Sequence, residues 1–436
     1  MTLSKKPYKG CRDFIPKDMR IREFLFDNMH SSAKKFAYEP YDGPLLEEVE
    51  LYKAKSGEEL INDQIYSFED RGGRQVAIRP EMTPTLARMV AGVHREVPKP
   101  LRWYSIPNLM RYEKPQRGRV REHWQYNVDI FGAPKNLGEV EILNLIIDFL
   151  TGFGADKSMF SILINDRSIV DSLFCQVLGL DEEKSYKLYK VIDKAKKVSA
   201  EKLDKMIIET IEDTKKIDAF KEYLSCSTFE DILAYIQKHQ LQEQTQDFAQ
   251  FIQMVKELSM ADYIQYDPTI VRGLDYYTGI VFEIFDKHPE NNRAIAGGGA
   301  YANLLQIFNE PALSGVGFGL GDVTLKDFLA THNLLPDFTH AQNDLYVFYT
   351  QKEQQLKSLN WSNDLRAHNL NIELHLGEIK FNKIFKLAQN KGYEHIAIIE
   401  ERDGKVTAQL KNLSDKSSEV FELTDIQSIK KYLKKG

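Results

Sequence analysis

The segment from Arg111 to Gln125 concentrates positive charge in an otherwise slightly acidic chain. Four arginines and one lysine fall within eleven residues there, whereas the 436-residue chain carries a formal net charge of -6. An arginine presents its donors as a planar fork that fits a phosphate group. We interpret the segment as a clamp for a polyphosphate, with a solvated loop as the competing interpretation.

The sequence on both sides of this basic segment predicts an antiparallel hairpin. Residues 101–106 and 109–112 carry aromatic and branched side chains, which places Arg111 inside the first strand. In the second strand, apolar residues alternate with Gln125, Asn127 and Asp129. A solvated face typically carries Lys, Glu and Thr instead of short amides and an acid. We therefore expect this face to form the floor of a ligand site.

Length and composition limit the class of protein. A chain of 436 residues with 42% hydrophobic and 28% charged residues is typical of a globular protein with two or three domains. It contains no run of about 18 apolar residues, which argues against a membrane protein. The N-terminus lacks the apolar core of a secretion signal, so we expect a cytoplasmic location.

The cysteines and histidines argue against a zinc site. Cys11, Cys175 and Cys226 form no CxxC pair, and the ten histidines show no HxxxH spacing. Such cysteine usage fits a reducing compartment. The pI of about 6.0 argues against a nonspecific nucleic-acid coat, although local basic patches still permit a specific RNA partner.

The N-terminal part predicts a helix over residues 19–36, followed by an edge strand marked by Pro40 and Pro44. That arrangement suits a subunit interface or a surface connection. After a strand at 76–79, Thr83 is predicted to cap a helix whose first residue is Pro84. Glu81 precedes it and either supports the helix N-terminus electrostatically or anchors a ligand ammonium group.

Two later parts of the chain differ from the rest in composition and in the spacing of their apolar residues. Residues 166–262 have almost no glycine, no proline and repeated helical spacings, which predicts an inserted helical module. We interpret its lysine runs at 194–197 and 215–216 as solvated helix faces. Contact of these lysines with an RNA backbone is the alternative. Residues 341–436 alternate strand and helix patterns, as in a small α/β domain that binds by its surface.

Between these two parts, three glycine-rich segments lie at residues 271–279, 296–301 and 315–321. Glycine in strands indicates close approach of the backbone to another group. Tight strand crossing and a bound ligand are both candidates. None of the segments is a GxGxxG sequence opening a βαβ unit, so a dinucleotide-binding fold is disfavoured.

Together these motifs resemble those of class II aminoacyl-tRNA synthetases, in their histidyl form. Arg111-Tyr112-Glu113 with the basic loop and Gln125 resembles the second class II motif. Arg79-Pro80-Glu81 followed by Thr83, and the string from Val271 to Tyr277, resemble the histidyl motifs. The resemblance covers essentially the whole chain, because the helical module and the C-terminal α/β domain fall where that family has them.

The resemblance implies an α+β catalytic domain built on a mainly antiparallel sheet. Its halves would span residues 1–165 and 263–333, with the helical insertion at 166–262 and an anticodon-binding α/β domain at 341–436. The implied activity is that of a histidine–tRNA ligase, an ATP-dependent enzyme that forms histidyl-adenylate and then charges histidine tRNA. ATP with Mg²⁺, histidine and histidine tRNA would be its partners, without DNA or a membrane. Pro44 would belong to the motif that forms a homodimer.

The resemblance also assigns roles to single residues. Arg111 and Arg272 would be the catalytic cations at the α-phosphate, Glu113 would face the adenine, and Arg119 or Arg121 would reach the outer phosphates. The residues implied to bind histidine are Glu81, Met82, Thr83, Gln125, Asp129, Tyr276, Tyr277 and Tyr301. Glu81, Thr83 and Gln125 would meet its amino and carboxyl groups, and Asp129, Tyr277 and Tyr301 would surround its imidazole.

Three positions depart from the family pattern. Ala300 and Ala302 stand where the family has an arginine and an aspartate around Tyr301, and Thr324 stands where the third class II motif has a phosphate-binding arginine. Loss of one such cation costs several kcal/mol unless another replaces it, and Arg121 and Arg293 are the candidates.

These departures leave alternatives open. The chain could be a weakened relative that senses histidine as a regulatory subunit. Such regulators typically lack the C-terminal domain, which this chain has. A pure RNA-binding scaffold is a further alternative, but it would not need Glu81, Gln125 and Tyr277 together.

Overall fold

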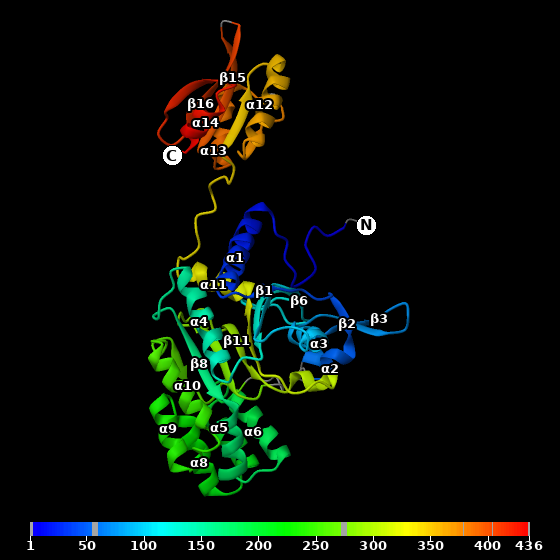
Figure 1. The fold of residues 1–436 in the computed structure, drawn as a ribbon, viewed down its shortest axis with the longest axis vertical. Coiled ribbons are helices and arrows are strands. Elements are labelled where there is room, and N and C mark those ends of the chain that lie inside the picture. Colours follow the sequence, from blue (N-terminus) through cyan, green and yellow to red (C-terminus); the bar gives the residue numbers. More distant parts are fainter. Residues whose placement is uncertain (1–2, 55–59, 272–276, 378, 403, 435–436) are drawn as a thin grey trace. The chain divides into compact units, whose positions relative to one another are not determined.

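The computed structural model describes residues 3–54, 60–271, 277–377, 379–402 and 404–434 (Figure 1). The chain divides into two compact units, Met1–Leu335 and Pro336–Gly436. No helix within the described ranges combines the length and the apolar character needed to cross a membrane.

A nine-stranded sheet organises the first unit. Its strands follow the order β1-β5-β7-β12-β11-β10-β8-β9, with β6 added alongside β7. Neighbours are antiparallel except for the pairs β1–β5 and β8–β9, which confirms the predicted mainly antiparallel sheet. The strands are β1 (Glu39–Pro40), β5 (Leu101–Ser105), β6 (Asn108–Met110), β7 (Glu122–Phe131), β8 (Phe160–Asp166), β9 (Ile264–Tyr266), β10 (Ile280–Asp286), β11 (Ala294–Tyr301) and β12 (Gly315–Gly321).

Strand alternation in β7 separates the core from the opposite face of the sheet. Tyr126, Val128 and Ile130 are almost fully buried and join the main hydrophobic cluster. Helices α1 (Pro16–Lys35), α4 (Leu137–Gly152) and α11 (Asp322–Thr331) contribute to that cluster, and α4 and α11 contact β7 directly. Burying an apolar side chain of this size contributes about 1.5–3 kcal/mol. The residues that alternate with them, Gln125, Asn127 and Asp129, therefore lie on the opposite face of the sheet.

The predicted basic hairpin is present, but its first strand is shorter than expected. Strand β6 ends at Met110, which pairs with Glu122, so Arg111 follows the strand instead of lying inside it. Arg111 N still donates to Arg121 O at 2.8 Å. The ladder stops there because Tyr112 N donates to Gln64 O of another segment, at 2.6 Å.

A small sheet and two helices lie beside the large sheet. The sheet contains β2 (Leu46–Glu48), β4 (Gln75–Ile78) and β3 (Tyr66–Glu69), and the helices are α2 (Val49–Lys53) and α3 (Thr83–Val93). The predicted cap of α3 is wrong by one residue. Met82 is the N-cap and Thr83 is already helical, because Pro84 is tolerated anywhere in the first turn. The edge strand predicted near Pro40 is confirmed as β1.

Residues after β8 form the helical run that the sequence predicted. The helices are α5 (Arg167–Ser172), α6 (Glu182–Lys194), α7 (Ala200–Thr210), α8 (Thr214–Ser225), α9 (Phe229–Lys238) and α10 (Gln246–Glu257), with a π-helical turn η2 (Leu173–Val177). Side chains of Asp181, Ser199, Asp213 and Thr228 cap four of them. The helices cluster together in Figure 1 and belong to the same compact unit as the large sheet.

The second unit contains a five-stranded sheet in the order β14-β13-β15-β16-β17. Its strands are β13 (Leu345–Tyr349), β14 (Ile372–Leu374), β15 (His395–Arg402), β16 (Lys405–Asn412) and β17 (Ser418–Glu422), and its helices are α12 (Gln355–Ala367), α13 (Phe381–Asn390) and α14 (Ile426–Leu433). The expected α/β pattern is confirmed. Strand β17 was not predicted, because this edge strand buries Phe421 alone and so lacks apolar alternation.

Candidate functional site

The floor of the site is the polar face of β7, and the glycines of β12 make room for it. Gly317 pairs with Asp129, and Gly321 pairs with Gln125. A Cβ atom on Gly317 would lie 2.6 Å from Asp129 Cγ, and one on Gly319 would lie 2.6 Å from Gln125 Cδ. Glycine at every second position of β12 therefore lets the β7 side chains lean over the neighbouring backbone.

A cavity of about 60 Å³ opens above this floor. It brings together Arg111 and six of the eight residues predicted to bind histidine. Its lining consists of Glu81, Thr83, Arg111, Gln125, Asn127, Asp129, Tyr277, Gly297, Tyr301, Gly317, Phe318 and Gly319. Segments far apart in sequence supply them: the start of α3 with Glu81 just before it, the turn after β6, the segment before β10, and strands β7, β11 and β12.

The other two predicted histidine-binding residues are not part of this cavity. Met82 is 1% exposed and does not line it, and its sulfur lies 3.9 Å from Arg79 Nη1. Met82 therefore packs beneath the site. Tyr276 lies outside the described residues, as does Arg272, the predicted second catalytic cation.

The surroundings of Asp129 in this cavity change its acidity. It is buried, and the Tyr301 hydroxyl donates a hydrogen bond to its Oδ1. Burial raises the pKa of Asp129 to about 7, and the hydrogen bond from Tyr301 opposes that rise. Asp129 can therefore gain or lose a proton near neutral pH.

A second cavity, of about 440 Å³, adjoins the first. Arg111, Gln125, Gly297 and Gly319 line both of them. The Arg111 side chain is fixed at this junction because its Nε donates to Pro80 O at 2.8 Å. A group in the small cavity and a group in the large one can thus approach the same guanidinium.

Two further predicted nucleotide-binding residues line the large cavity. Glu113 is buried, and Arg119 forms an ion pair with it that includes a hydrogen bond from Nη2 to Oε1 of 2.8 Å. Between the alternatives Arg119 and Arg121, only Arg119 lines the large cavity.

Arg121 has a different environment. Its Nη1 donates to the Tyr8 hydroxyl at 2.9 Å, and its guanidinium lies 4.0 Å from the centre of the Tyr112 ring. The N-terminal segment also covers it, since a Cβ on Gly10 would lie 2.7 Å from Arg121 Cγ. The interpretation of Arg121 as a phosphate ligand is therefore not supported by its position. The position of Arg121 in the sequence gives no indication that the N-terminal segment covers its side chain.

Sequence reasoning missed His123 and Lys197, which both line the large cavity. His123 could have been found, because it continues the period-two face of Gln125. Burial and the charges of Arg111 and Arg12 lower the pKa of His123 to about 3, so its ring stays neutral.

Lys197 belongs to a lysine run that we interpreted as a solvated helix face. Within that run, Lys196 instead forms an ion pair with the largely buried Asp267. Lys197 reaches the large cavity beside that contact. Both side chains stay largely exposed, at 63% and 67%, and Lys197 also pairs with Asp193 at 3.0 Å. The interpretation of a solvated face therefore holds for these two lysines, although the folded chain also brings Lys197 to the large cavity.

The three departures from the family pattern lie in different places. Thr324 lines the large cavity and its hydroxyl donates to Ile295 O at 3.1 Å and Gly321 O at 3.2 Å. Ala300 is buried in the core, and neither it nor Ala302 lines either cavity. The two alanines therefore contribute no side chain to the walls of either cavity.

Comparisons with known proteins point to one family. Residues 10–323 match the model of the family described as histidyl-tRNA synthetase. A histidine–tRNA ligase of Leptospira biflexa is 40% identical over 99% of both chains, and one of Thermoplasma volcanium is 34% identical over 96% of both. The crystal structure of a histidyl-tRNA synthetase from Nostoc superposes with a TM-score of 0.76, covering 99% of this chain and 100% of that one. At 23% identity, this last likeness concerns the fold.

The raised pKa of Asp129 predicts a pH-dependent stability. The folded carboxyl keeps its proton up to about pH 7, whereas an unfolded one ionises near pH 3.9. Between these values the native state binds more protons, so its free energy of unfolding falls as pH rises, by up to about 1.4 kcal/mol per pH unit. The substitution Asp129→Asn removes the titrating group and should abolish this fall.

The measurement is the unfolding midpoint in urea at pH values from about 4 to about 8, across the two pKa values. Asp218→Asn, the same change on an exposed residue of α8, is the control. Parallel pH curves for the parent and Asp129→Asn would contradict the predicted proton on Asp129.

Proposed function

The chain belongs to the histidyl-tRNA synthetase family, and from this premise we propose how its site works as a histidine–tRNA ligase. It activates histidine with ATP to give histidyl-adenylate and pyrophosphate, and then transfers histidine to the terminal adenosine of histidine tRNA. The observation that carries the proposal is the junction at Arg111 and Gln125, which line both cavities. The small cavity takes histidine and the large one takes ATP, so the histidine carboxylate meets the α-phosphate at Arg111.

The chemistry suits these residues. Attack of a carboxylate on phosphorus needs in-line positioning and cations beside the developing charge, with little proton transfer. Arg111 is held at the junction by Pro80 O before any substrate binds, so little reorganisation is needed. Arg272, implied by the family pattern to be the second cation, remains a proposal.

The small cavity separates the two ends of histidine. Glu81 is buried beside the start of α3 and offers a negative charge to the ammonium group, with Thr83 and Gln125 near the carboxylate. Asp129 and Tyr301 lie together and can accept an imidazole N–H, which fixes the tautomer of the ring. Tyr277 completes the wall.

The large cavity offers separate contacts for base and phosphates. The neutral ring of His123 provides a face on which adenine can stack, and Glu113 provides an acceptor for its amino group. Arg119 belongs to the same cavity and can move from Glu113 to the outer phosphates.

Magnesium would be held mainly by those phosphates. Mg²⁺ takes few protein carboxylates and keeps waters and phosphate oxygens, and it neutralises phosphate charge when bound. The described residues contain no cluster of three or more side chains suited to holding a metal, but Glu283 lines the large cavity. A single carboxylate fits such an ion, and we assign Glu283 as its protein ligand.

The regulatory alternative has no specific observation in its favour. Two relatives that match 96% or more of the chain are named as ligases, and the chain also contains a C-terminal unit. Both cavities carry the charged residues that activation needs.

Histidine-dependent exchange of pyrophosphate into ATP tests this proposal. The parent should exchange with histidine and not with other amino acids. Arg111→Ala should lower kcat by roughly 10²–10³-fold, because it removes a fixed cation from the reacting phosphate. Arg95→Ala, an exposed arginine paired with Glu310, serves as the control and should exchange like the parent. Absence of histidine-dependent exchange in the parent protein would contradict the ligase proposal.

We propose that residues 341–436 bind the anticodon, as the family pattern implies. Histidine tRNA that lacks its anticodon stem-loop should then be charged at least about tenfold more slowly, since a loss of about 1.4 kcal/mol of binding gives that factor. Pyrophosphate exchange without tRNA should be unaffected. Undiminished charging would contradict the anticodon role.

We also propose a homodimer formed around Pro44. Leu45 and Leu46 beside it are 49% and 43% exposed, and Pro44 lines a groove with Leu51 and Phe308. Sedimentation should give the mass of two chains, and replacing Leu45 and Leu46 by aspartate should give that of one. Translation places the proposed activity in the cytoplasm, which fractionation of cells can test.

A further inference from the structure

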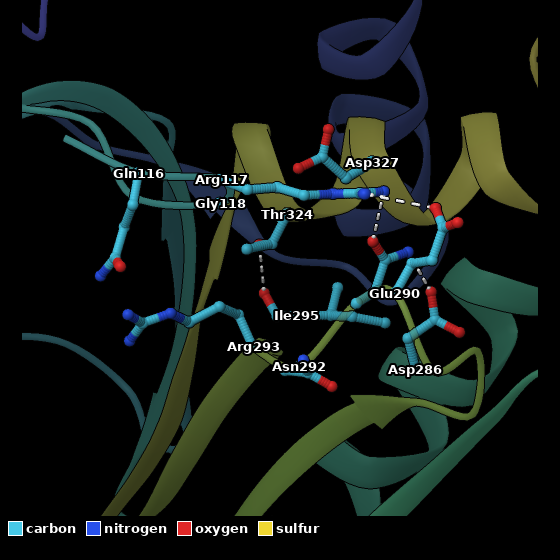
Figure 2. A pocket seen from close by; sticks show the side chains of 11 residues that line it. Gln116, Arg117, Gly118, Asp286, Glu290, Asn292, Arg293, Ile295, Thr324 and Asp327 are labelled. Atoms are coloured by element: carbon cyan, nitrogen blue, oxygen red, sulfur yellow. Dashed lines mark hydrogen bonds and ion pairs between the residues drawn. The ribbon is translucent and has the colours of Figure 1, made fainter.

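Arg293 lies in the β10–β11 connection, immediately before β11, and lines the large cavity that we assign to ATP. It also lines an adjacent cavity of about 420 Å³, shown in Figure 2. Its stem supports the tip of the basic loop, since a Cβ on Gly118 would lie 3.3 Å from Arg293 Cγ and 3.5 Å from Thr324 Cγ2. Arg293, Gly118 and Thr324 thus meet at one edge of the ATP cavity.

The neighbouring arginines already have partners. Arg117 forms an ion pair with Glu290 at 3.3 Å and donates to Asn291 Oδ1 at 3.0 Å. Figure 2 shows the Arg293 side chain extending the other way, toward the side on which Gln116 lies. Among the residues drawn there, no hydrogen bond or ion pair joins Arg293 to another side chain. Its guanidinium is exposed to the cavity and available to an anion.

Thr324 cannot supply that charge. Its hydroxyl donates to backbone oxygens of Ile295 and Gly321, and the side chain is neutral. At the edge of the cavity where the third motif would place an arginine, the cation therefore comes from the β10–β11 connection instead of α11. The two positions are adjacent because both contact the same loop glycine, Gly118.

We propose that Arg293 is a catalytic residue that binds the outer phosphates of ATP. This inference rests on the proposed function and deepens it. A planar guanidinium can hold two phosphate oxygens at once and stabilise the charge that develops on departing pyrophosphate. Arg119 lines the same cavity, so both cations are available to the polyphosphate.

The test compares binding of ATP and AMP to Arg293→Gln by calorimetry in the full chain. AMP lacks the outer phosphates, so the variant should bind AMP and histidine like the parent while its Kd for ATP rises at least about tenfold, the effect of losing about 1.4 kcal/mol. In pyrophosphate exchange, kcat/KM for ATP should fall by roughly 10²-fold and KM for histidine should stay unchanged. Lys287→Gln, which removes a charge from the same β10–β11 connection, is the matched control.

Parent-like ATP affinity and exchange in Arg293→Gln would overturn the proposal, and so would an equal loss of ATP and AMP binding. Retained histidine affinity shows that the variant is folded, because Arg293 does not line the small cavity. The double variant Arg293→Gln with Thr324→Arg should recover ATP affinity, and no recovery would overturn the equivalence of the two positions. Absence of exchange in the parent is a separate result that concerns the ligase proposal itself.

Discussion

The pairing of a glycine strand with a polar strand is the constraint on which the site depends. Gly315, Gly317, Gly319 and Gly321 alternate along β12, and the register sets them against the odd-numbered residues of β7. A one-residue slip would turn Gln125 and Asp129 into the core and Tyr126 and Val128 toward the ligand. Because the even-numbered residues are buried under α4 and α11, that slip is strongly disfavoured. The same hydrophobic burial that stabilises the sheet therefore positions the recognition groups.

The electrostatics follow from the same arrangement. A buried carboxyl beside a tyrosine hydroxyl has a raised pKa, and a histidine enclosed with two arginines has a lowered one. The pKa of Asp129 is therefore close to neutral pH, while His123 stays uncharged at the wall of the large cavity. Neither property belongs to the isolated residue, since both arise from withdrawal from water.

Cations reach the large cavity from separate parts of the chain. Arg111 and Arg119 come from the basic hairpin, Lys197 from the helical run, and Arg293 from the connection between β10 and β11. A polyphosphate between them would join segments separated by many residues. The helical run thus contributes directly to the large cavity through Lys197, and the neighbouring Lys196 pairs with Asp267 after β9.

The amino-acid sequence alone was enough to predict the helical run, the C-terminal α/β pattern, the mainly antiparallel sheet and most of the residues of the small cavity. Those features are local patterns: alternation in β7, glycine at every second residue of β12, and short motifs such as Arg111-Tyr112-Glu113. The tertiary structure decided what depends on contacts between distant segments. It separated Arg119 from Arg121 by covering Arg121 with Tyr8 and Gly10, and it turned Met82 beneath the site. It also brought Lys197 and Arg293 to the same cavity, because packing of the helical run and the sheet, not sequence spacing, sets those distances.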